Sequence, residues 1–136
     1  MADRSIIEVR WAAASIDEAR KVSRYLVENR LIACAQIVPL IESLYLWDGQ
    51  LTASQESLVL LKTTQEQLEK VQEVILSHCS YELPELLYFT AIGGLTDYID
   101  WVYETVVYPT TLVGGSGKPP SQEGASAEDT SANRPD

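Results

Sequence analysis

The chain has 136 residues, enough for one domain, and 46% of them are hydrophobic, enough to form a buried core. Its formal net charge at pH 7 is −10, and the basic residues form no cluster beyond Arg20, Lys21 and Arg24, which lie in one predicted helix among acidic residues. A protein that binds nucleic acid or an anionic membrane unaided needs a basic face to neutralise phosphates. We therefore expect neither nucleic acid nor membrane as a partner.

The two cysteines point to a reducing compartment. Cys34 and Cys79 are too few for a disulfide framework and lack CxxC spacing. The first residues lead straight into a strand-like segment without the apolar core of a signal peptide. No apolar stretch approaches the length of a membrane span. We expect a reduced, cytoplasmic protein.

Strand-like and helical patterns alternate along the chain. Apolar residues at helical spacing predict helices, and each of the first two such runs follows a capping box, in which a Ser or Thr and a Glu three residues later bond the free backbone groups. The predicted strands are 6–11, 33–47, a return strand that ends with 57–63, and 85–92. The predicted helices run from the box at 15–18 to about residue 30, from the box at 63–66 onward, and from 96 to 106.

This order of elements predicts an α+β domain. Strand, helix, a hairpin, helix and strand form the ferredoxin-like βαββαβ arrangement, in which the helices cover one face of an antiparallel sheet. We place this domain, with its long hairpin and a C-terminal helix, at residues 1–108. Residues 109–136 are rich in Gly, Pro, Ser and acidic side chains and contain no aromatic residue, which is typical of a disordered tail.

The predicted hairpin is longer than its own domain. Residues 33–47, extended at about 3.3 Å each, span about 50 Å, whereas a domain of about 100 residues is about 35 Å across. Asp48-Gly49 predicts the tight turn at the tip, and residues 44–47 make that tip apolar. We expect neighbouring subunits to cover it, since closed oligomers usually bury such patches. The alternative is that a bend or bulge at Pro39 folds the hairpin back over its own sheet.

Five motifs along residues 5–106 carry a family resemblance. They are Arg30-Leu31-Ile32-Ala33-Cys34 followed by Ile37 and Pro39, Ser43-Leu44-Tyr45-Leu46-Trp47-Asp48-Gly49, Glu56 with Lys62-Thr63, Tyr81-Glu82-Leu83-Pro84-Glu85, and Asp97-Tyr98-Ile99-Asp100-Trp101. In this order they resemble the divalent-cation tolerance (CutA) family. The chain departs from the family pattern at Cys79, where His is usual, and at Trp11, where some relatives place a Cys proposed as a metal ligand.

The resemblance implies a ferredoxin-like homotrimer, built much like the PII signalling proteins, with clefts between its subunits. It also implies an association with copper or other divalent metal ions, and it brings no catalytic reaction. We therefore expect a metal-binding or metal-response protein that is not an enzyme and has no catalytic residues. The alternative is a PII-like signalling or scaffolding trimer that binds a small ligand or a protein partner in its clefts, without a metal.

His78 and Cys79 are the candidate metal ligands. An imidazole beside a thiol suits copper and other soft metals. Two adjacent ligands do not complete a site, because structural zinc normally takes four. The alternative is that His78 caps the end of its helix, where the helix dipole favours it, while Cys79 packs in the interior.

A second set of aromatic and charged side chains predicts an inter-subunit cleft. The set is Tyr45, Trp47, Lys62, Tyr81, Glu85 and Trp101. Lys62 ends an apolar strand, where an unpaired ammonium is costly, and Glu85 is its candidate partner. Aromatic walls around one ion pair suit a small ligand. The alternative is that the same side chains seal the subunit interface.

Overall fold

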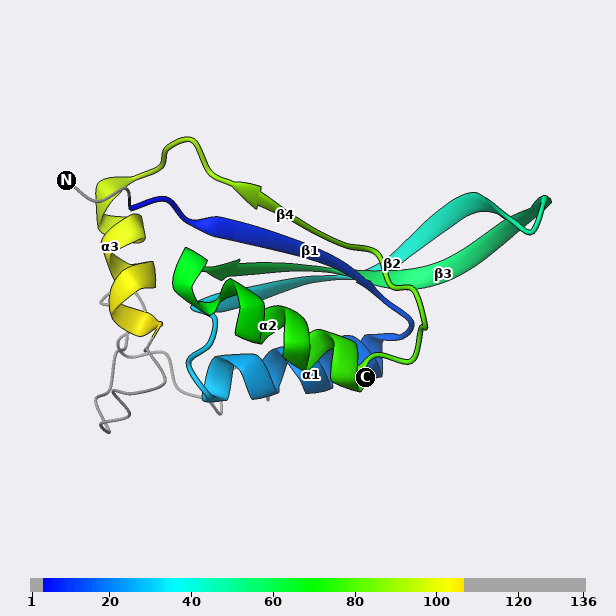
Figure 1. Cartoon of the computed structure of the whole chain (residues 1–136), viewed down its shortest axis with the longest axis horizontal. Coiled ribbons are helices and arrows are strands. Elements are labelled where there is room, and N and C mark those ends of the chain that lie inside the picture. Colours follow the sequence, from blue (N-terminus) through cyan, green and yellow to red (C-terminus); the bar gives the residue numbers. More distant parts are fainter. Residues whose placement is uncertain (1–3, 107–136) are drawn as a thin grey trace.

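The computed structural model describes residues 4–106, which form four strands and three helices (Figure 1). In chain order they are β1 (Ile7–Ala13), α1 (Ile16–Glu28), β2 (Cys34–Trp47), β3 (Gln50–Thr63), α2 (Gln65–His78), β4 (Leu86–Thr90) and α3 (Thr96–Thr105). The predicted tail at 109–136 and the predicted domain boundary at 108 lie outside the described residues.

The strands form one sheet in the order β2-β3-β1-β4, and every neighbouring pair is antiparallel. Ile7 at the start of β1 lies opposite Thr63 on one side and Thr90 on the other. Helices α1 and α2 lie side by side on one face of the sheet, and α3 lies at its end (Figure 1). This is the predicted α+β, ferredoxin-like βαββαβ fold with a C-terminal helix.

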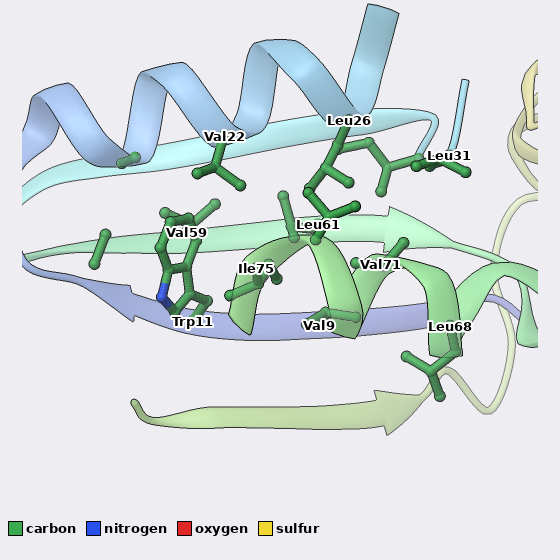
Figure 2. Packing of buried hydrophobic residues seen from close by; sticks show 14 of the residues in the cluster. Val9, Trp11, Val22, Leu26, Leu31, Val59, Leu61, Leu68, Val71 and Ile75 are labelled. Carbon is green, nitrogen blue, oxygen red and sulfur yellow. The ribbon is translucent and has the colours of Figure 1, made fainter. Parts of the chain in front are cut away.

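The main core lies between the sheet and the helices α1 and α2. Val9 and Trp11 of β1 point toward the helices because alternate residues of a strand face the same side, and Figure 2 shows them packed beneath Val22 and Ile75. Trp11 is fully buried, and its indole Nε1 finds no hydrogen-bond acceptor among residues 4–106. The indole acts here as a large apolar side chain that fills the middle of the core.

Helices α1 and α2 begin differently. Ser15 caps α1 as predicted, because its Oγ accepts a hydrogen bond from the Glu18 backbone N–H at 3.1 Å. The predicted capping role of Thr63 is wrong. Thr63 is the last residue of β3, and its buried hydroxyl donates to the Leu31 carbonyl at 2.7 Å; α2 starts after Thr64, whose side chain makes no cap bond.

The hairpin of β2 and β3 projects well beyond the rest of the subunit (Figure 1). Its strands turn at Asp48 and Gly49, both with positive φ, as an Asp-Gly hairpin turn requires. The ladder shifts register between Val38 and Ile41, so the predicted bulge at Pro39 is confirmed. This bulge does not fold the hairpin back over its own sheet, and that alternative is wrong for the subunit.

The other face of the sheet has neither α1 nor α2 to cover it. Strand alternation places Leu58, Leu60, Leu87 and Phe89 there, and all four are partly or largely exposed. A second apolar surface lies on the outer side of the hairpin, where Leu44, Leu46 and Leu51 are exposed. We call these two surfaces the open sheet face and the hairpin leucine face.

Candidate functional site

A groove runs between the inner side of the hairpin and the loop that precedes β4. Its volume is about 750 Å³. Four of the six residues predicted for the cleft line it, namely Tyr45, Trp47, Tyr81 and Glu85. The structure therefore brings together, within one subunit, four residues that span 41 positions of the sequence.

Strand alternation explains why the hairpin contributes these side chains. Ser43, Tyr45 and Trp47 share one side of β2 because they are two residues apart. The Tyr45 hydroxyl lies 2.7 Å from the Ser54 hydroxyl of β3, which fixes the ring across the ribbon. The leucines at the intervening positions point to the opposite side. One face of the ribbon is thus aromatic and polar, and the other is the hairpin leucine face.

Glu56 is the most buried charged side chain of the groove, with 8% of its surface exposed. The Ser43 hydroxyl donates to its Oε1 at 2.6 Å, and the Tyr81 side chain is hydrogen-bonded to the same carboxylate. Burial, this hydrogen bond and the negative charge of Glu56 raise the pKa of Tyr81 from 10.0 to about 12. Tyr81 therefore stays a neutral donor at any physiological pH.

Glu56 and Ser43 were not predicted as site residues. The signal available was the acidic residue of β3, opposite Ile41 in the ladder. That signal needs the register of the hairpin, and the bulge near Pro39 changes the register between the base of the hairpin and its tip. Sequence spacing alone does not place Glu56 under Tyr81.

Lys62 and Trp101, the other two predicted members, lie at the opposite end of the sheet. Lys62 is paired with Glu8 in the ladder, whereas the backbone of Glu85 bonds that of Ala12. Glu8 and Ala12 are four steps apart along β1, about 14 Å at the usual rise of a strand. The ammonium of Lys62 donates instead to Gln36 Oε1 at 2.8 Å. An ion pair between Lys62 and Glu85 is thus not formed within a subunit, and remains a prediction for contacts between subunits.

Trp101 belongs to α3, where its ring lies 5.5 Å from that of Tyr98. Its Nε1 is buried without an acceptor in the part of the chain that the structure describes. Tyr98 in turn lies 3.9 Å from the Cys34 sulfur, and burial together with this thiol raises its pKa to about 12. These groups form a small cluster at the start of β2, separate from the groove.

His78 is the last residue of α2, and its ring lies 6.0 Å from that of Tyr25 in α1; Cys79 follows it and packs, partly buried, against the main core. The His78 Nδ1 lies 2.8 Å from the Val74 carbonyl, which only accepts, so Nδ1 is the donor, and Nε2 is the nitrogen that a neutral ring would offer to a metal. The Cys79 thiol donates to the Tyr81 carbonyl at 3.4 Å. Between residues 4 and 106, no group of three or more His, Cys, Asp and Glu side chains is arranged to hold a metal ion.

Comparison with known proteins decides the family. The family profile described as "CutA1 divalent ion tolerance protein" matches residues 7–105. The chain belongs to this family. A CutA divalent-cation tolerance protein from Thermus thermophilus is 38% identical over 90 residues, which are 66% of this chain and 87% of that protein. A chloroplastic CutA from Arabidopsis thaliana is 34% identical over 86 residues, 63% of this chain and 47% of the relative.

Solved CutA structures have the same fold. The crystal structure of CutA1 from Ehrlichia chaffeensis superposes with a TM-score of 0.74 at 25% identity, and covers 79% of this chain and 100% of its own. The structure of a CutA from Archaeoglobus fulgidus, described as periplasmic, superposes with a TM-score of 0.72 at 29% identity. It covers 75% of this chain and 99% of its own. The CutA family is named for tolerance of divalent cations and not for a reaction. No helix within residues 4–106 of this chain is long and apolar enough to cross a membrane.

Proposed function

We propose that this chain is a cytoplasmic, homotrimeric CutA protein that acts by binding divalent metal ions, copper among them, and that it is not an enzyme. The proposed assembly is supported above all by the two uncovered apolar surfaces, the open sheet face and the hairpin leucine face. The membership of the CutA family supports the link to divalent metals. Both cysteines are free, which agrees with a reducing compartment.

The positions of the two surfaces favour a ring. The open sheet face and the hairpin leucine face consist of different residues on different parts of the subunit, so contact between them is heterologous. Heterologous contacts that close form cyclic oligomers. Three subunits follow from the resemblance to PII-like trimers. In such a ring the projecting hairpin of each subunit packs on its neighbour, which protects the free edges of the sheet.

The proposed metal ligands are His78 through Nε2 and Cys79 through its thiolate. Imidazole and thiolate are ligands that copper binds strongly. The hydrogen bond from Nδ1 to the Val74 carbonyl supports this role, because a second-shell acceptor of this kind orients a metal-binding imidazole. The remaining ligands would come from outside the subunit.

A copper titration of the chelator-treated trimer tests this site. We expect the variants Cys79→Ser and His78→Ala each to lose one equivalent of tightly bound copper per subunit. The control is Cys34→Ser, which removes the other thiol and should leave the stoichiometry unchanged. If both site variants bind as much copper as the unmodified protein, the ligand assignment is wrong.

The groove favours a second function, that of a PII-like trimer that binds a small ligand or partner without a metal. The Trp47 ring is 54% exposed although it lies in a concave site, so the subunit leaves its surface available for contact. A thermal-shift screen of the metal-free trimer tests this function with nucleotides, organic acids and amines. A melting temperature that no compound raises counts against it.

A further inference from the structure

We propose that the groove between the hairpin and the loop before β4 binds a linear aliphatic polyamine, with Glu56, Glu82 and Glu85 as the carboxylates that pair with its ammonium groups. This inference rests on the second function proposed above and names the class of ligand. It follows from the charge of the groove, from the number of its carboxylates and from its aromatic walls.

The charge of the groove has one sign. Glu56, Glu82 and Glu85 line it, and no Lys, Arg or His of the described residues does. Glu56 is the decisive member because more than nine-tenths of its surface is buried. Its partners are the neutral hydroxyls of Ser43 and Tyr81, and it forms no ion pair with any other residue between 4 and 106. A buried carboxylate is normally balanced by a cation, and here the groove leaves room for one.

The carboxylates of the groove favour an organic cation with several charges over a metal ion. A divalent metal draws several ligands onto one point at about 2.0–2.6 Å. These three carboxylates line a single groove, yet they are not among any cluster of the described chain that is arranged to hold a metal. Three carboxylates in one groove match a cation that carries several ammonium groups on a flexible chain. A polyamine is such a cation.

The walls of the groove suit the methylene and ammonium groups of such a chain. Tyr45, Trp47 and Tyr81 contribute aromatic rings to the lining. Aromatic faces attract ammonium groups through the ring quadrupole and also pack against methylene groups. The volume of about 750 Å³ lies within the range of roughly 300–1,000 Å³ that is usual for small-molecule sites.

The main competing occupant is Lys62 of a neighbouring subunit. Among residues 4–106 of its own subunit, the ammonium of Lys62 donates to Gln36 and forms no ion pair with a carboxylate. A single lysine brings one positive charge, whereas the groove holds three carboxylates. We therefore favour the polyamine, and the variant Lys62→Met separates the two occupants.

The test uses the full-length, chelator-treated protein with spermidine, in about 150 mM salt to screen long-range attraction. Calorimetry gives the affinity, and the fluorescence of the exposed Trp47 reports occupancy of the groove. We expect spermidine to bind at least tenfold more tightly than butylamine, which has a single ammonium. We expect Glu56→Gln and Glu85→Gln each to weaken spermidine at least tenfold. Glu85 is exposed, so its variant stays informative if Glu56→Gln fails to fold.

The matched control is Glu73→Gln, which removes the same charge from the exposed side of α2, away from the groove. An equal loss of affinity in this control would overturn the inference, because the attraction would then be due to net charge alone. Binding that appears only in Lys62→Met would assign the groove to the neighbour's lysine. Absence of binding in both proteins would also overturn it. Light scattering on the same samples shows whether each protein is a trimer, so that a loss of spermidine binding is not confused with a loss of assembly.

Discussion

Replacing Leu46 with Ala tests whether sister subunits stabilise the hairpin. Leu46 is 71% exposed in the subunit, so assembly has most of its side chain left to bury. Burying a leucine fully stabilises by roughly 1.5–3 kcal/mol, and truncation to Ala of one that is already partly buried loses about 1.5 kcal/mol per subunit. Three subunits lose about 4.5 kcal/mol per trimer, which raises its dissociation constant by more than about a thousandfold.

The assay is dilution of the protein to nanomolar concentration, with the mass followed by single-molecule photometry. The control is Leu76→Ala, because Leu76 is similarly exposed, at 55%, but lies on α2 away from both apolar surfaces. We expect the control to dissociate like the unmodified protein. If Leu46→Ala and the control dissociate at the same concentration, the hairpin leucine face does not contribute to assembly.

Three further predictions concern the subunit itself. Trp11→Ala should lower the free energy of unfolding by about 3–5 kcal/mol, as measured by urea denaturation. Trp11→Phe should lower it by less than half of that amount, because Phe keeps most of the side-chain volume and removes an indole N–H that has no acceptor. Thr63→Val should destabilise by about 1–2 kcal/mol in the same assay, because it leaves the Leu31 carbonyl without its buried donor. The Tyr81 phenol should titrate near pH 12 in absorbance measurements, and Glu56→Gln should move the pKa of Tyr81 toward 10. Because folding raises this pKa, the contribution of Tyr81 to stability is present below pH 10 and is lost as the pH rises toward 12. If the pKa of Tyr81 is the same in Glu56→Gln as in the unmodified protein, Glu56 is not a cause of the shift.

The fold was predictable from the sequence because local signals agreed with the tertiary structure. Ser15 caps a helix in the sequence pattern and in the structure, and Asp48-Gly49 makes the turn that its composition predicts. Thr63 shows the limit of such signals. A Thr three residues before a Glu fits a capping box, but here the strand continues through it and its hydroxyl bonds the loop before β2 instead.

The candidate site was only partly predictable, because its assembly depends on strand register. Tyr45, Trp47, Tyr81 and Glu85 line one groove of the subunit, whereas Lys62 lies at the other end of the sheet, and their place in a cleft between subunits stays a prediction. Residue types alone do not reveal whether two charged side chains, such as those of Lys62 and Glu85, lie at the same end of the sheet. The role of His78 and Cys79 as metal ligands stays a prediction, because the described residues of one subunit hold no group of three or more side chains that could bind a metal ion.

The solution mass of the full-length protein tests the central claim most directly. A homotrimer held by the open sheet face and the hairpin leucine face has a mass of about 45 kDa, three times the 15.1 kDa of the chain, and light scattering should give this value over a wide range of concentrations. A folded species that scatters as 15.1 kDa at every concentration would contradict the account, because both apolar surfaces would then be stable in water.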